Sequence, residues 1–172
     1  RSNTLVATVM SNFGLELAMR EQGINLLRTD VGDRYVVKRM REGDFNLGGE
    51  QSGHIILLDH STTGDGILTA LHMLSIMQRE DRRLSELQEV MRSAPQTLIN
   101  VLVRDKPALE TLDTVVREIE RSEKALAGSG RVLVRYSGTE KKCRVMVEGE
   151  ASSDVEAHAG RIAEAIAEAI GA

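Results

Sequence analysis

Aromatic residues are scarce in this sequence: they make up 2% of its 172 residues, and tryptophan is absent. Hydrophobic residues still reach 41%, so the cores must be built from aliphatic side chains. Proteins that bind single-stranded nucleic acid stack its bases on aromatic rings, which this chain hardly offers. A formal net charge of -4 also argues against a polyanion-binding surface. We therefore expect no nucleic-acid partner, and expect any anion to be recognised in a local pocket.

Cysteine is almost absent as well. Cys143 stands alone, which excludes an internal disulfide bond, and no Cys/His group has the spacing of a zinc site. No apolar run approaches the length of a membrane span, and the first residues lack the apolar core of a signal peptide. These absences predict a cytoplasmic protein without a membrane partner. Because the chain starts almost within a predicted strand, we expect it to be a piece of a longer protein.

The hydrophobic pattern predicts two domains, since the stretch Ser93-Ala94-Pro95 interrupts it. Residues 1–93 are expected to form an α/β domain that is incomplete at its N-terminus. Predicted strands at 5–10 and 24–27 flank a helix at 11–20. They are followed by a short helix to Met40, a hairpin at 47–58 and a helix with Leu68, Leu71 and Leu74 on one stripe.

Residues 96–172 are expected to form a small α+β domain of the order β-α-β-β-α. A strand is predicted at 97–103, followed by a long amphipathic helix from Leu109 to Leu126. Two strands around a polar turn at 137–141 come next. The last helix carries apolar residues at helical spacing, namely Val155, Ala159, Ile162, Ile166 and Ile170.

The polar turn has the composition of a phosphate site. Arg135 and Arg144 flank Ser137-Gly138-Thr139, and over residues 131–144 five basic residues against one acidic residue give +4. Arginine offers a planar fork of donors to a phosphate, hydroxyls add neutral donors, and glycine permits a close backbone approach. The alternative is an ordinary hairpin turn with solvated charges.

A second polar motif lies at Glu50-Gln51-Ser52-Gly53-His54. In an extended strand, Glu50, Ser52 and His54 would face the same side, because side chains alternate. A carboxylate, a hydroxyl and an imidazole on one face suit the hydroxyl or amino groups of a sugar. Glycine-flanked polar turns are common, however, so the motif alone is a weak indication.

Taken together, the motifs resemble the α-D-phosphohexomutase family. The resemblance rests on residues 48–54, on Gly64-Asp65-Gly66, on Arg-x-Ser-Gly-Thr-Glu at 135–140, and on Val31-Gly32-Asp33-Arg34-Tyr35-Val36. Within the family, the sequences of these motifs are most similar to those of bacterial members that act on glucosamine phosphates. Family members have four domains, and this chain is similar to most of the third (1–93) followed by the fourth (96–172).

The resemblance implies roles for individual residues. Glu50 and Ser52 would bind the sugar hydroxyls, His54 would lie in the substrate pocket and assist proton transfer, and Asp33 and Arg34 would belong to a pocket loop. The phosphate-binding residues would be Arg135, Ser137, Gly138, Thr139 and Arg144. The family's phosphoserine loop and its aspartate-rich Mg²⁺ loop have no counterpart here, so no metal ligand is expected in this chain.

The implied reaction interconverts glucosamine 6-phosphate and glucosamine 1-phosphate through a phosphoserine enzyme and glucosamine 1,6-bisphosphate, on the route to UDP-N-acetylglucosamine and cell-wall precursors. Mg²⁺ and the nucleophile would come from the missing N-terminal domains, so the fragment alone is expected to be inactive; the intact protein would be an isomerase and a homodimer. Two alternatives stay open: a mutase for glucose or mannose phosphates, and a non-catalytic module that binds sugar phosphates.

Overall fold

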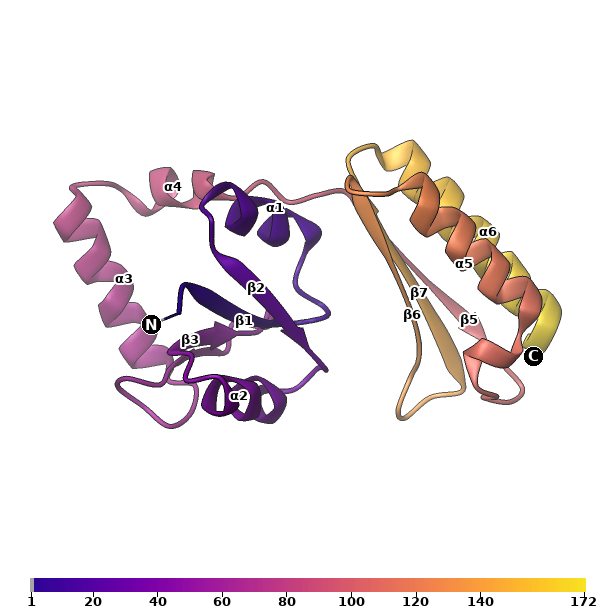
Figure 1. Ribbon diagram of the computed structural model, residues 1–172, viewed down its shortest axis with the longest axis horizontal. Helices are drawn as coiled ribbons and strands as arrows, with labels where there is room; N and C mark the ends of the chain where they lie inside the picture. The colour runs from indigo at the N-terminus through magenta and orange to yellow at the C-terminus, as the bar shows by residue number, and fades with distance from the viewer. Residues whose placement is uncertain (1) are drawn as a thin grey trace. The chain divides into compact units, whose positions relative to one another are not determined.

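The computed structural model describes residues 2–172, whose contacts divide them into two compact units (Figure 1). The first unit ends at Ser93, and the second runs from Ala94 to Ala172. Each unit has its own sheet and its own hydrophobic core. No helix among the described residues is long and apolar enough to cross a membrane.

The first unit is built on a four-stranded sheet with the order β2-β1-β3-β4. Its strands are β1 (Thr4–Thr8), β2 (Asn25–Thr29), β3 (Leu47–Gly49) and β4 (Ile55–Leu57). β1 runs parallel to both β2 and β3, whereas β3 and β4 form an antiparallel hairpin. Helix α1 (Phe13–Glu21) connects β1 to β2, and α2 (Asp33–Glu42) connects β2 to β3. The α/β class expected from the sequence is confirmed.

Helix α2 packs closely on this sheet because β3 contains glycine. Val6, Val36, Met40 and Ile56 form the buried core between them. A Cβ atom on Gly48 would lie 2.5 Å from the sulfur of Met40 and 2.8 Å from Cγ1 of Val36. The close approach fixes the start of α2 beside the end of β3, where the two polar segments at 31–34 and 50–54 lie.

Helix α3 (Gly66–Glu80) lies where the sequence predicts a helix with Leu68, Leu71 and Leu74 on one stripe. No residue of α3 is buried, however, and both Leu71 and Leu74 are 59% exposed. Periodicity identified residues that share a helix face, but it does not show that anything within the described chain packs on that face. A short helix α4 (Leu84–Leu87) and a 3₁₀ turn η1 (Gln88–Val90) follow.

The second unit has a three-stranded antiparallel sheet with the order β5-β7-β6, formed by β5 (Gln96–Leu102), β6 (Gly130–Tyr136) and β7 (Lys142–Gly149). Helices α5 (Asp113–Ala125) and α6 (Ser152–Ile170) both cover the same face of it (Figure 1). The order β-α-β-β-α is thereby confirmed. The predicted long helix is shorter, since Leu109–Thr111 forms a separate 3₁₀ turn η2 and the non-helical backbone of Leu112 (ψ 83°) precedes α5.

Alternation along the strands decides which side chains face away from the helices. Cys143, Val145 and Val147 lie in the core, together with the five residues predicted for the last helix. The intervening residues of β7, such as Arg144, must therefore point to the other side. We call this side the helix-free face of the second sheet.

Candidate functional site

The segment 50–54 is a tight turn between β3 and β4, not the extended strand that its alternating polar residues suggested. The Glu50 N–H donates to the His54 carbonyl (2.8 Å), and the Gly53 N–H donates to the Glu50 carbonyl (3.0 Å). Gly53 closes the turn with φ 98°, a backbone conformation that favours glycine. The strand ends at Gly49 because the chain must reverse here.

The turn nevertheless brings the three predicted side chains together. The Ser52 hydroxyl lies 3.2 Å from Oε2 of Glu50 and 3.4 Å from Nδ1 of His54. The same Nδ1 is 3.9 Å from Oε2 of Glu50. The side chain of His54 is 61% exposed, whereas that of Glu50 is 12% exposed. The largely buried carboxylate of Glu50 and the accessible imidazole of His54 therefore form a polar group that a ligand can reach.

Glu50 also connects this turn to the loop before α2. Its Oε1 accepts a hydrogen bond from the Gly32 N–H at 2.7 Å. The next residue, Asp33, opens α2 and accepts from the Arg34 N–H (2.7 Å), and the Arg34 guanidinium donates to the Tyr35 hydroxyl (2.7 Å). The segment containing Asp33 and Arg34 therefore lies beside the 50–54 turn, as a shared pocket requires.

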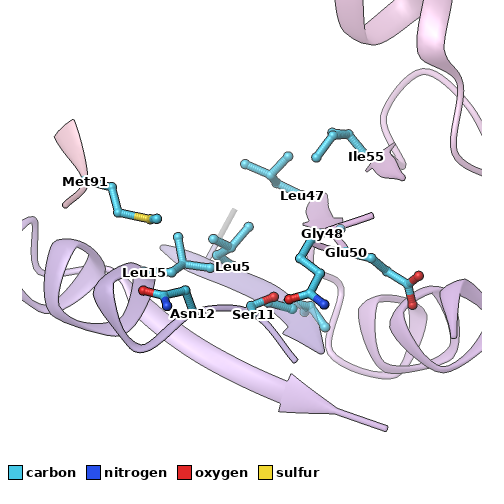
Figure 2. A pocket seen from close by; sticks show the side chains of 13 residues that line it. Leu5, Ser11, Asn12, Leu15, Leu47, Gly48, Glu50, Ile55 and Met91 are labelled. Atoms are coloured by element: carbon cyan, nitrogen blue, oxygen red, sulfur yellow. The ribbon is translucent and has the colours of Figure 1, made fainter. Parts of the chain in front are cut away.

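A cavity of about 340 Å³ adjoins the same strand but has a different character. Figure 2 shows Leu5, Leu15, Leu47 and Met91 around it, while the Glu50 carboxylate points away from these apolar side chains. Glu50 and Gln51 are among its lining residues, but the lining is otherwise mostly apolar. We therefore do not assign the cavity to the candidate site.

In the second unit, the two predicted arginines lie in one row. Arg135 on β6 is directly opposite Arg144 on β7, which in turn is opposite Asn100 on β5. All three belong to the helix-free face, since their neighbours Val134, Cys143 and Val101 face the core. The row adjoins the 137–141 turn, so cationic and amide groups gather at this end of the sheet.

Glu140 partly neutralises this cluster. It accepts from Lys142 Nζ at 2.5 Å and from the Arg144 guanidinium at 3.2 Å. The hydrogen bond from Lys142, and then that from Arg144, hold the pKa of this exposed carboxyl below its ordinary value. One donor remains: the Nε of Arg144 is buried and has no hydrogen-bond partner among residues 2–172. Such a donor is costly unless an acceptor reaches it.

The turn itself presents further donors. The Ser137 hydroxyl accepts from the Glu140 N–H (3.2 Å), and the Ser137 N–H donates to the Lys142 carbonyl (2.9 Å). Within the described chain, neither the Gly138 nor the Thr139 N–H donates to another residue. A Cβ atom on Gly138 would meet nothing within 4 Å, so the space beside the turn is open. Successive unpaired amides of this kind bind anions.

One cation at this turn, Lys106, is not predicted by the sequence motifs. Lys106 Nζ donates to the Ser137 carbonyl at 2.6 Å, from the loop that follows β5. Lys106 lies 31 residues before Ser137 in the sequence, so the sequence around the turn does not indicate this contact. Elsewhere in residues 2–172, no three His, Cys, Asp or Glu side chains are grouped so that they could hold a metal ion.

Comparison with known protein families agrees with this arrangement of an α/β unit followed by a small α+β unit. The model of the phosphoglucomutase/phosphomannomutase alpha/beta/alpha domain III matches residues 1–94, and that of the C-terminal domain matches residues 98–169. The chain belongs to the phosphoglucomutase/phosphomannomutase family. The resemblance found in the sequence motifs is confirmed.

Among curated proteins, the chain is similar to phosphoglucosamine mutases. It is 52% identical to those of Citrifermentans bemidjiense and Myxococcus xanthus, and 53% identical to that of Thermobifida fusca, over 99%, 99% and 96% of its length. It spans only 38%, 37% and 37% of those relatives.

Solved structures show the same fold at lower identity. The N-acetylphosphoglucosamine mutase of Aspergillus fumigatus in complex with glucose 1,6-bisphosphate is 19% identical, with a TM-score of 0.78 over 98% of this chain and 39% of that one. The same enzyme with GlcNAc-6P and magnesium is 18% identical, with a TM-score of 0.75 over 95% and 41% of the two chains.

Proposed function

We propose that this chain is the substrate-binding part of a phosphoglucosamine mutase, which interconverts glucosamine 6-phosphate and glucosamine 1-phosphate through a bisphosphate. The names of the relatives support the substrate, since they match almost the whole chain at about half identity. In this proposal, residues 1–93 and 96–172 are the third and fourth domains of a cytoplasmic, homodimeric enzyme.

The row of Arg135 and Arg144 beside the 137–139 turn carries the proposal. Arg135 and Arg144 are cross-strand partners, and the Nε of Arg144 has no hydrogen-bond partner among the described residues. In the adjoining turn, the Gly138 and Thr139 N–H groups donate to no other described residue. A phosphate dianion offers acceptors for all of these donors. The hydroxyls of Ser137 and Thr139 can add neutral donors.

The 50–54 turn would hold the sugar. The Oε2 atom of Glu50 and the Ser52 hydroxyl can bind vicinal hydroxyl or amino groups, and the exposed His54 imidazole can move a proton near them. Asp33 would face the amino group of the sugar from the neighbouring loop. Arg and amide donors recognise the negative charge of a phosphate and depend little on the shape of the attached sugar. The phosphate site would therefore accept either phosphate of the bisphosphate in turn.

The phosphoryl carrier and the magnesium would lie in parts of the protein beyond this chain. Magnesium would offset phosphate charge during the transfer. The test is a coupled mutase assay on the full-length protein with glucosamine 1-phosphate, and with glucose 1-phosphate as the competing substrate. We expect preference for the amino sugar and no turnover by the isolated 172-residue chain, even with Mg²⁺ and glucose 1,6-bisphosphate. Turnover by the isolated chain would place the nucleophile within it and overturn the proposal.

A further inference from the structure

The ammonium of Lys106 holds one peptide group of the turn at 137–141, which we call the phosphate turn after its proposed ligand. Its Nζ lies 2.6 Å from the Ser137 carbonyl oxygen, and Ser137 is 3% exposed. The carbonyl oxygen of Ser137 and the N–H of Gly138 belong to the same planar, trans peptide unit, so they point in opposite directions. By fixing the carbonyl on one side, Lys106 directs the Gly138 N–H to the other.

This peptide group needs an external constraint. Gly138 has no side chain, and no atom lies within 4 Å of the position that a Cβ would take. Glycine also allows both signs of φ, so a reversal of the Ser137–Gly138 peptide meets little steric resistance. The reversed peptide would present a carbonyl oxygen, instead of an N–H, to a phosphate bound at this turn.

Other contacts of the turn do not hold that carbonyl. The Ser137 N–H bonds to the Lys142 carbonyl, and its hydroxyl accepts from the Glu140 N–H. Lys142 and Arg144 are both engaged with Glu140. Among the described residues, Lys106 is thus the side chain that contacts the peptide oxygen.

We propose that Lys106 is a positioning residue of the phosphate turn, which keeps the Gly138 N–H directed at the phosphate by holding the Ser137 carbonyl. The inference rests on the proposed phosphate-binding function of this turn. The inference predicts that phosphate binding depends on the contact of Lys106 with the Ser137 carbonyl more than on its positive charge alone. A general electrostatic contribution would not require that contact.

The experiment titrates the ¹⁵N-labelled 172-residue chain with inorganic phosphate and with glucosamine 6-phosphate, following the amide signals of Gly138 and Thr139 by NMR. Lys106→Met removes the contact, and Lys106→Arg can restore a donor to the Ser137 carbonyl. Lys141→Met is the matched control, because it removes the same charge from an exposed residue of the same turn.

We expect Lys106→Met to weaken binding about tenfold and to abolish the ligand-induced shift of the Gly138 amide. Lys141→Met should change the affinity about twofold or less and keep that shift, and Lys106→Arg should restore it. Equal losses in the two Met variants, or an unchanged Gly138 response in Lys106→Met, would overturn the inference while leaving phosphate binding intact. If the unmodified chain shows no response at 137–140, the proposed function of the turn fails, and the inference fails with it.

Discussion

Arg135 and Arg144 are direct cross-strand partners in the antiparallel pair of β6 and β7. Two like charges in this arrangement repel each other and destabilise a sheet. Asn100, the other neighbour of Arg144, carries no compensating charge. Glu140 offsets part of the repulsion from the turn. A pairing that is unfavourable for the fold is understandable if a bound anion lies between the two guanidinium groups.

We therefore predict that Arg135→Ala weakens sugar-phosphate binding but changes the free energy of unfolding little. Loss of a charge-assisted contact should cost about 1.5–3 kcal/mol of sugar-phosphate binding, which would appear as a raised KM in the full-length enzyme. The free energy of unfolding of the chain should fall by no more than about 0.5 kcal/mol, since the cross-strand repulsion is relieved as well. Urea unfolding and mutase kinetics measure the two quantities.

Arg131→Ala is the contrasting variant on the same strand. Arg131 pairs with Glu148, whose side chain is fully buried, at 2.5 Å. Its removal would leave a buried carboxylate without this partner and should cost about 3–5 kcal/mol of stability. If Arg135→Ala and Arg131→Ala destabilise the chain equally, Arg135 is a structural residue, and its assignment to the phosphate is wrong.

Glu50 should tolerate Gln far better than Ala in terms of stability. A Gln carbonyl can still accept from the Gly32 N–H, whereas Glu50→Ala breaks the connection between the two loops and should cost about 1–2 kcal/mol. Both variants should lose mutase activity in the full-length protein, because both remove the carboxylate near Ser52 and His54. An active Glu50→Gln enzyme would show that Glu50 only joins the loops.

The carboxyl of Glu140 should titrate below its ordinary pKa of 4.5, because Lys142 and Arg144 donate hydrogen bonds to it. The ion pairs of Glu140 then contribute to the stability of the folded chain above pH 4.5, and this contribution is lost as the pH falls through the lowered pKa. A side-chain ¹³C titration measures this. Lys142→Met should raise the pKa of Glu140 more than Arg144→Met does, since the Lys142 bond is the largest cause. The reverse order would contradict the described pairing.

Cys143 should be unreactive in the folded chain. The residue is fully buried, and burial raises the pKa of its thiol from the ordinary 9.0 to about 11. Iodoacetamide at pH 8 should label it only after unfolding, because the thiolate is the nucleophile. Since the folded pKa is the higher one, its contribution to stability is complete below pH 9.0 and is lost as the pH rises towards about 11. Rapid labelling of the native protein would contradict its burial.

Trypsin should cleave the chain first at Arg92. Residues 91–95 have no regular secondary structure, and Arg92 and Ser93 are exposed at the end of the first unit. Exposed connecting segments are the preferred sites of cleavage. Mass spectrometry should show a fragment that begins at Ser93 and stays folded by circular dichroism. Initial cleavage within 97–172 would argue against the proposed domain boundary.

The best predicted element was the last helix, where all five apolar positions from Val155 to Ile170 are buried. Helical spacing defines a face, and here α6 packs that face on the sheet. On α3 the same helical spacing places Leu71 and Leu74 on one stripe, but both are exposed, because the spacing does not show whether another element packs on that face. Buried Ser122 on α5 was missed, since it is held by the ring of His158, 36 residues away.

The candidate site shows the same limit. The sequence singled out Glu50, Ser52 and His54, and they do converge, but through a turn closed by Gly53 and not through strand alternation. Lys106 could not be predicted from the local excess of basic residues at 131–144, because it lies 31 residues before Ser137 in the sequence. Local composition predicts which segments carry polar chemistry. Contacts between distant segments come from the packing of the fold.

The strand order β5-β7-β6 has a consequence for how the second unit folds. β6 and β7 are joined by residues 137–141 alone, whereas β7 meets β5 only after the long segment 103–141 has been closed into a loop. Short loops lose less entropy on closure, so the hairpin should form before the third strand is added. We therefore expect the 137–141 turn to form early in folding, so that substitutions there alter the folding rate as well as the affinity.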